Sequence, residues 1–97
     1  MNDDEKWMQI AIQEAIKAEK EGEVPVGAVL VKDGLLIAKA HNQPISKNDA
    51  TAHAEIQLIR AAGKELQNYR LNGSILFVTL EPCAMCFGAL VHARVKR

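Results

Sequence analysis

The stretch "VPVGAVLVKDGLLIAKAH", residues 24–41, contains two apolar runs of residue types that favour β-strands. These runs, residues 24–31 and 35–41, are joined through Asp33-Gly34. Asp-Gly is a strong signal for a tight hairpin turn, because both positions of such a turn require a positive φ that these residues tolerate. The sequence therefore predicts two strands that pair as a hairpin.

Helical patterns lie on both sides of this hairpin. In residues 4–21 the apolar positions fall on one face of a helix, with lysine and glutamate elsewhere. The stretch "ATAHAEIQLIRAAG" predicts a second helix over residues 51–62, closed by Gly63. The polar residues 42–49, between the hairpin and this helix, include a proline, so we expect a loop there.

The last third of the chain adds a strand and a helix. Residues 74–80 predict the strand, and residues 82–93 predict a short helix with Pro82 at its first position. The final residues "RVKR" have the character of a further strand that has only begun. The order helix, hairpin, helix, strand, helix is typical of a layered α/β domain.

Composition is that of one small globular domain. The chain has 97 residues, 48% of them hydrophobic, and its 12 basic and 12 acidic residues cancel. Without an overall positive charge, a nucleic-acid partner would have to be recognised by a local patch. The acidic N-terminus lacks the apolar segment of a signal peptide, and no apolar run is long enough to span a membrane. We therefore expect a cytoplasmic protein with no membrane partner.

Three side chains of the types that zinc prefers are His53, Cys83 and Cys86. The two cysteines stand one helical turn apart near a helix start, where the amide dipole favours the thiolate. Three protein ligands leave a fourth position open for water, as catalytic zinc sites require. Glu55 lies two residues after the histidine, and a carboxylate there suits proton transfer between water and a substrate nitrogen.

Each of these motifs has a simpler interpretation when it is taken alone. A C-x-x-C pair is often a redox motif or part of a core, and a single histidine more often caps a helix or lies on the surface. Together, however, the residues fit H-x-E followed by P-C-x-x-C, which is the signature of the zinc deaminases. The combination therefore favours a catalytic zinc site.

The wider sequence resembles the bacterial tRNA-specific adenosine deaminases, which form part of the cytidine deaminase-like superfamily. The similar stretches are "EVPVGAVLV", "TAHAEI", "NYRL", "VTLEPCAMC" and "GALVHARV". The zinc motifs identify only the superfamily, whereas "VPVGAV" and "TLEPCAMC" narrow it to the tRNA enzymes. Guanine and other purine-base deaminases are the nearest alternative. Small tetrameric cytidine deaminases fit less well, because they usually have a cysteine where this chain has His53.

This resemblance implies a three-layer α/β fold with a mixed sheet flanked by helices, and one zinc ion per subunit. The implied reaction is the hydrolytic deamination of adenosine to inosine at the wobble position of tRNA anticodons, with Glu55 as the catalytic proton shuttle. Asn42 and Val26 match family residues that contact the target nucleoside and pack on its base. On sequence alone, Asn42 would rather be a turn residue. Val26 could equally be an ordinary core residue of a strand.

The resemblance also implies two partners, the tRNA anticodon loop and a second copy of the chain. A splayed loop suits a buried site because the target base must leave its stack. The apolar residues 86–93 exceed one buried helix face, which favours a homodimer or, alternatively, packing against further C-terminal elements. A local basic patch could be formed by Lys47, Lys64, Arg70, Arg94, Lys96 and Arg97; the alternative is that these side chains belong to an ordinary solvated surface.

We expect residues 1–97 to form a single zinc-dependent deaminase domain that corresponds to the N-terminal two-thirds of the family's domain. The family continues with two more strands and further helices, so this part of the sheet is expected to lack its last strands. The alternative to an enzyme is an inactive, zinc-stabilised module, but a purely structural site has no use for Glu55. His41 and His92 are expected to be structural.

Overall fold

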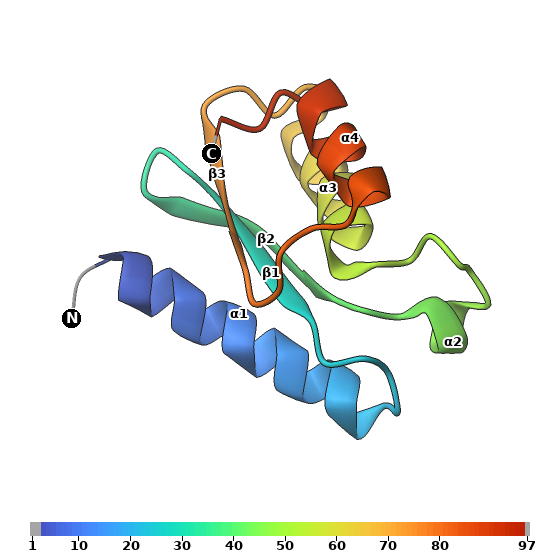
Figure 1. Cartoon of the computed structure of the whole chain (residues 1–97). Helices are drawn as coiled ribbons and strands as arrows, with labels where there is room; N and C mark the ends of the chain where they lie inside the picture. The colour runs from blue at the N-terminus through green and yellow to red at the C-terminus, as the bar shows by residue number, and fades with distance from the viewer. Residues whose placement is uncertain (1–2, 97) are drawn as a thin grey trace.

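The computed structural model describes residues 3–96. Helix α1 lies against one face of a three-stranded sheet, α3 lies against the other face, and α4 packs beside α3 (Figure 1). This is the three-layer α/β arrangement implied by the resemblance. The helices and strands are α1 (Asp3–Lys20), β1 (Gly27–Lys32), β2 (Leu35–His41), α2 (Pro44–Lys47), α3 (Ala54–Leu66), β3 (Ser74–Val78) and α4 (Ala84–His92).

The sheet has the strand order β2-β1-β3, and both pairs of neighbours are antiparallel. The predicted hairpin is confirmed, since Asp33 and Gly34 have φ angles of 53° and 75° and connect β1 to β2. The register between these two strands shifts at Leu30/Val31. Within residues 3–96 the sheet contains no parallel pair of strands.

The central strand β1 is buried on both faces because successive side chains alternate between them. Val29 and Val31 point towards α1, where they pack with Trp7, Ala11 and Phe77. The first residue of β1 is Gly27, and the close approach of α1 requires a glycine there. A Cβ atom at Gly27 would overlap the backbone carbonyl of Ala11, so α1 lies on the strand at a distance that no side chain permits.

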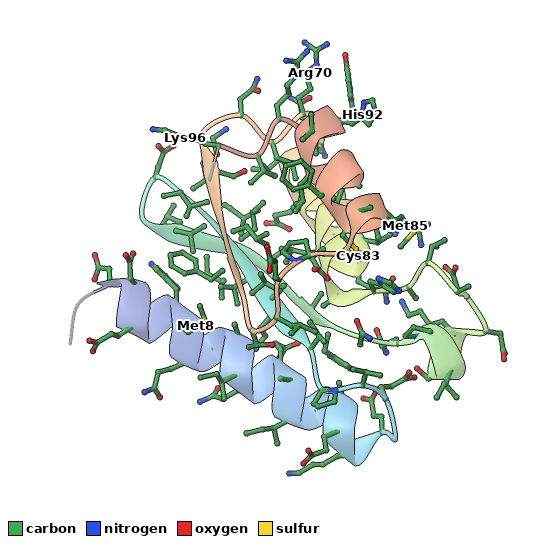
Figure 2. The ribbon with its side chains drawn as sticks, in the orientation of Figure 1. Met8, Arg70, Cys83, Met85, His92 and Lys96 are labelled. Atoms are coloured by element: carbon green, nitrogen blue, oxygen red, sulfur yellow. The ribbon has the colours of Figure 1, made fainter. Side chains whose placement is uncertain are left out.

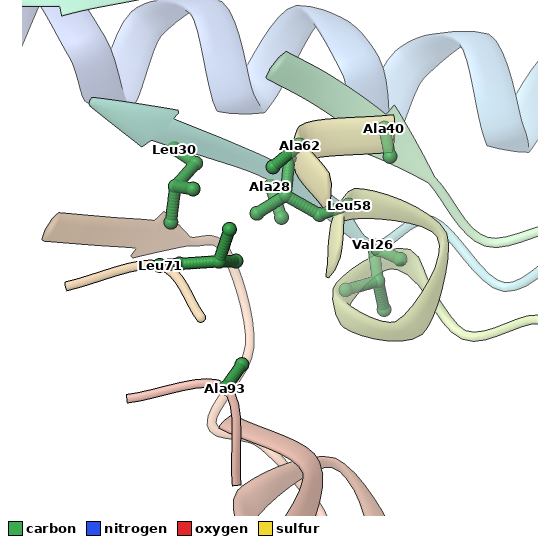
Figure 3. Close-up of a cluster of buried hydrophobic side chains, with 9 residues drawn as sticks. Val26, Ala28, Leu30, Ala40, Leu58, Ala62, Leu71 and Ala93 are labelled. Atoms are coloured by element: carbon green, nitrogen blue, oxygen red, sulfur yellow. The ribbon is translucent and has the colours of Figure 1, made fainter. Parts of the chain in front are cut away.

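The opposite face of the sheet carries the larger core, which packs against α3 and the end of α4 (Figure 3). Leu58 is fully buried there, and burial of a leucine side chain stabilises a fold by about 1.5–3 kcal/mol. Many of the other members are alanines, which let the helix approach the sheet closely. The buried members of this core are Val26, Ala28, Leu30, Ala40, Ala54, Leu58, Ala62, Leu71 and Ala93.

The predicted bounds of the helix over residues 51–62 are wrong at both ends. Helix α3 begins at Ala54 and continues through Gly63 to Leu66. The additional turn brings Leu66 against the core, and Gln67 then ends the helix in the left-handed conformation with φ 52°. A residue other than glycine therefore provides the C-cap, and its N–H donates to the last helical carbonyls.

The segment 42–49 is not entirely a loop, because it contains the short helix α2. The first backbone N–H groups of this helix are satisfied from a distant part of the chain. Glu23 accepts hydrogen bonds from the backbone N–H of Ile45 at 3.1 Å and of Ser46 at 2.7 Å. The Glu23 carboxylate thus caps α2, although it lies about twenty residues earlier in the sequence.

The strand expected in the last residues is not formed in the described part of the chain. Residues 94–96 are irregular, although the N–H of Lys96 donates to the carbonyl of Ser74 at 2.9 Å, beside the first residue of β3. Arg97 lies outside the described residues. Among residues 3–96, no helix is both long enough and apolar enough to cross a membrane.

Candidate active site

The candidate site is built at the starts of two helices that pack against each other, α3 and α4. His53 immediately precedes α3 and Cys83 immediately precedes α4, while Cys86 lies in the first turn of α4. Figure 2 places Cys83 at the end of α4 that is remote from His92. His53 and Cys83 are thirty positions apart in the sequence. They meet because the helices that follow them pack against each other.

The donor atoms of the three predicted ligands all lie within 4.8 Å of one another. The Nδ1 atom of His53 lies 3.6 Å from the Sγ atom of Cys83 and 3.4 Å from that of Cys86. A tetrahedral zinc ion with Zn–N of about 2.0–2.1 Å and Zn–S of about 2.3 Å requires this separation to be about 3.6 Å. Both thiols are free, and no disulfide joins them. The residues fit a zinc ion, as the resemblance implies.

The two thiols differ in their electrostatic surroundings. The backbone N–H of Cys86 lowers the pKa of the exposed Cys83 thiol and outweighs the effect of desolvation. Cys86 is fully buried, and burial together with the nearby Glu55 carboxylate raises the pKa of its thiol to about 12. A buried thiol beside a carboxylate retains its proton unless a cation is bound next to it. A metal ion bound between the two thiols would favour the thiolate form of both cysteines.

Glu55 is the second residue of α3, and its side chain is only 4% exposed. It lies beside the thiols and lines a cavity of about 250 Å³ that also contains His53 and Cys83. A carboxylate in a small, mostly apolar cavity next to a metal site is suited to proton transfer. The cavity is lined by Val24, Val26, Asn42, His53, Glu55, Leu80, Glu81 and Cys83.

Asn42 and Val26, which the resemblance assigned to the substrate, both line this cavity. Asn42 is more than a turn residue. Its Oδ1 atom accepts a buried hydrogen bond from the backbone N–H of Ala54 at 2.9 Å, whereas the side chain of His53 makes no capping hydrogen bond. A side chain at the end of β2 thus caps the helix on which Glu55 lies.

Three cavity residues were not predicted from the sequence, namely Val24, Leu80 and Glu81. A local signal exists for each of them. Leu80 and Glu81 directly precede the P-C-x-x-C motif, and Val24 stands two residues before Val26, the spacing that places extended residues on one face.

The two remaining histidines, His41 and His92, do not line this cavity. His41 lies between two carboxylates, with Nδ1 at 3.3 Å from Glu14 and Nε2 at 3.1 Å from Glu21, and it connects the end of β2 to α1. His92 is exposed at the end of α4. Lys47 and Lys64 line one cavity, whereas Arg70 and Arg94 line another, so the predicted basic residues are not confined to one pocket.

The sequence matches one protein-family model along its entire length. The model describes the cytidine and deoxycytidylate deaminase zinc-binding region, and it matches residues 1–97. The sequence is also similar to curated proteins. It is 53% identical over 97 residues to the tRNA-specific adenosine deaminase of Bacillus subtilis strain 168, covering 100% of this chain and 60% of that protein.

A second relative is the tRNA-specific adenosine deaminase of Haemophilus influenzae, which is 55% identical over 95 residues. That match covers 97% of this chain and 55% of the relative. The corresponding enzyme of Buchnera aphidicola subsp. Schizaphis graminum is 51% identical over 96 residues, covering 99% of this chain and 64% of that enzyme. The chain thus spans between 55% and 64% of the length of these relatives.

Two solved structures have the same fold at substantial identity. One comes from biochemical and structural studies of A-to-I editing by tRNA:A34 deaminases at the wobble position. Its TM-score is 0.93 at 50% identity, with 95% of this chain and 71% of that chain covered. The other is a guanine deaminase from Bacillus subtilis, with a TM-score of 0.93 at 44% identity over 99% of this chain and 61% of that chain.

Proposed function

The chain belongs to the family of cytidine and deoxycytidylate deaminase zinc-binding domains, and from this membership we propose that it hydrolytically deaminates adenosine at the wobble position of tRNA. One observation carries the proposal: a fitting His-Cys-Cys ligand set and a buried glutamate share a cavity. The similarity to three tRNA-specific adenosine deaminases and to a structure from the study of tRNA:A34 editing supports the substrate class.

His53, Cys83 and Cys86 would hold the zinc ion. A zinc ion bound there would supply a Lewis acid that makes a water molecule a nucleophile near neutral pH. Glu55 takes a proton from that water, delivers it to a ring nitrogen of the adenine and then assists the departure of the exocyclic amine. Water oxygen replaces the amine on the ring, so that adenosine and water give inosine and ammonia.

The remaining cavity residues hold the base. Asn42 uses its oxygen atom for the helix, so its amide N–H groups remain to donate to an acceptor on the nucleoside. Val26 is 6% exposed and offers an apolar wall against which a planar base can pack. Because the cavity is small, a base has to leave its stack to enter, which an anticodon loop permits.

The chain would act as one zinc deaminase domain in a cytoplasmic homodimer. Phe87 and Val91 support a contact surface, since they are 64% and 57% exposed on α4. Exposed large apolar side chains on neighbouring helix positions are typical of an interface. Light scattering tests this point, because a monomeric protein would contradict the homodimer.

Free purine deamination is the competing function, because the structure also matches a guanine deaminase closely. The test measures zinc content together with two reactions on the same preparation. Inosine formation in an anticodon stem-loop RNA, without xanthine formation from guanine, is expected. Xanthine formation alone would identify a base deaminase, and zinc binding without either product would indicate an inactive module.

A further inference from the structure

An exposed turn between two buried residues precedes β3. Asn72 and Gly73 form this turn, and both are exposed. Their neighbours Leu71 and Ser74 are 1% and 0% exposed, and the N–H of Ser74 donates to the carbonyl of Leu71 at 3.2 Å, which closes the turn. Gly73 has a φ of 77°, and no atom lies within 4 Å of the place that a Cβ would take. Asn72-Gly73 is therefore the accessible part of a turn whose two ends are fixed in the interior.

Asn72-Gly73 is the type of residue pair in which spontaneous deamidation is fastest, because glycine has no side chain to hinder the approach of its backbone nitrogen. That nitrogen attacks the side-chain carbonyl carbon and gives up its proton, a C–N bond forms, and the side-chain amide leaves as ammonia. Water then opens the cyclic succinimide. Opening at the side-chain carbonyl gives aspartate, whereas opening at the backbone carbonyl gives isoaspartate, whose backbone is longer by a methylene group. In sum, asparagine and water give aspartate or isoaspartate and ammonia.

Hydrogen bonds restrain the other asparagines within residues 3–96, which are Asn42, Asn48 and Asn68. The Oδ1 atoms of Asn42 and Asn68 each accept a backbone N–H, at 2.9 Å and 3.0 Å. After Asn48, the N–H of the next residue donates to the carbonyl of Pro44 at 3.0 Å. At Asn72, neither the side-chain amide nor the N–H of the next residue has a hydrogen bond to any residue in this range. The two groups that have to react are thus both free there, and no bond has to break first.

The turn is attached to the segment that follows α4, beside the start of β3 (Figure 1). The N–H of Leu71 donates to the carbonyl of Ala93, and the N–H of Lys96 donates to the carbonyl of Ser74 at 2.9 Å. Leu71 and Ala93 also belong to the larger core. An additional methylene group between Leu71 and Ser74 would displace at least one of these buried anchors, because close-packed interiors have no room for it. The helix held by these anchors carries Cys86.

We propose that Asn72-Gly73 is a site of spontaneous deamidation, and that isoaspartate formed there loosens the attachment of the end of α4 to the start of β3. The inference is independent of the proposed function, because water is the one co-reactant. The aspartate product has a different effect. It retains the normal backbone and places its carboxylate in solvent, so it leaves the buried anchors where they are.

The first test incubates the zinc-loaded protein in mildly alkaline buffer, which favours loss of the proton from the attacking nitrogen. Trypsin then releases residues 71–94, a peptide whose one asparagine is Asn72. Its mass should rise by the difference between OH and NH2, with isoaspartate detected by an isoaspartate methyltransferase. Asn72→Gln should suppress the reaction, because a longer side chain closes the ring slowly, whereas Asn68→Gln is the matched control and should leave the rate unchanged. Unchanged mass in the folded protein, under conditions that convert a synthetic peptide of residues 69–76, would overturn the inference.

The second test follows thermal unfolding during the same incubation. Conversion to isoaspartate should lower the unfolding temperature by about 4–8 °C, the shift expected when a domain of this size loses the net contribution of one hydrogen bond. Freshly purified Asn72→Asp carries the new charge on a normal backbone and should unfold at the temperature of the parent. Asn72→Gln should keep its unfolding temperature throughout the incubation. An equal fall in incubated Asn72→Gln, or in fresh Asn72→Asp, would overturn the effect assigned to the longer backbone.

Discussion

The side chain of Asn42 is joined to the backbone of Ala54 by a buried hydrogen bond of 2.9 Å, from the N–H of Ala54 to Oδ1. Ala54 stands between the candidate zinc ligand His53 and the candidate proton carrier Glu55. This one hydrogen bond therefore connects the end of β2 to the segment that carries both residues. The same amide lines the cavity that a substrate would enter. Asn42 is therefore in a position to couple the wall of the cavity to the start of α3.

Removal of this amide should destabilise the fold. Asn42→Ala leaves the Ala54 N–H without its partner in a buried place, which costs about 1–3 kcal/mol in the free energy of unfolding. Asn42→Asp retains the acceptor and should lose much less stability, while it loses the donor offered to the substrate. Asn68→Ala is the matched control, because it removes a similar bond to the N–H of Arg70 on the exposed surface. Denaturant unfolding compares the variants, and equal losses for Asn42→Ala and Asn68→Ala would contradict the role of Asn42.

Zinc binding should depend on all three candidate ligands, His53, Cys83 and Cys86. His53→Ala, or the double change Cys83→Ala, Cys86→Ala, should abolish stoichiometric zinc binding, because fewer than three protein ligands remain. His92→Ala is the control, since that histidine is exposed at the opposite end of α4. Metal analysis of the purified proteins is the measurement. Full zinc occupancy in the double cysteine variant would show that the metal binds elsewhere.

Glu55→Gln should separate proton transfer from metal binding. The variant preserves the size of the side chain and should retain its zinc, but deamination should fall by about 10²–10⁴-fold because the proton carrier is lost. Glu65→Gln, an exposed change on the same helix, is the control and should leave the rate unchanged. Zinc content and inosine formation are measured together. A simultaneous loss of both in Glu55→Gln would reassign this residue to a structural role.

Glu23 should contribute to the loss of stability in acid. Burial by itself would raise the pKa of this carboxyl, but the hydrogen bonds from the backbone N–H groups of Ser46 and Ile45 outweigh it, so the folded pKa is lower than the unfolded one. A depressed folded pKa means that the stabilisation is present above the unfolded value of about 4.5 and is lost as the pH falls through the folded value.

The corresponding variant is Glu23→Gln, examined by thermal unfolding between about pH 6 and pH 3. It should be less stable than the parent near pH 6 and should approach the parent as the pH falls, because only the parent has a carboxylate to protonate at this position. A constant difference between the two proteins across this range would mean that the Glu23 charge does not hold α2.

Two glycines should respond in opposite directions to alanine. At Gly27 the new Cβ would overlap the Ala11 carbonyl, and forced separation of α1 from β1 should destabilise the fold by about 1–3 kcal/mol or more. At Gly88, inside α4, no atom lies within 4 Å of the added Cβ, so alanine should stabilise the helix by about 0.5–1 kcal/mol. Thermal unfolding of the two variants is the measurement. A destabilised Gly88→Ala would contradict the open surroundings of this position.

Local chemistry in the sequence was sufficient for the hairpin and for the donor set. The turn at Asp33-Gly34 depends on the φ angles that these two residues accept, and this preference acts without help from the rest of the chain. The bounds of β2, residues 35–41, were predicted correctly for the same reason, because the turn fixes where the strand begins. The spacing of H-x-E and P-C-x-x-C likewise identified the three residues that the fold brings together.

Tertiary contacts decided the features that depend on distant residues. Gly63 did not end α3, because packing of Leu66 against the core favours another helical turn over the local preference of glycine. Helix α2 formed in a polar, proline-containing segment because Glu23 satisfies its first N–H groups. Hydrogen bonds and burial between residues far apart in sequence leave no periodic pattern. The sequence alone therefore identified the candidate zinc ligands and the turn, whereas only the folded chain determined the Asn42 cap at the start of α3 and the cavity beside those ligands.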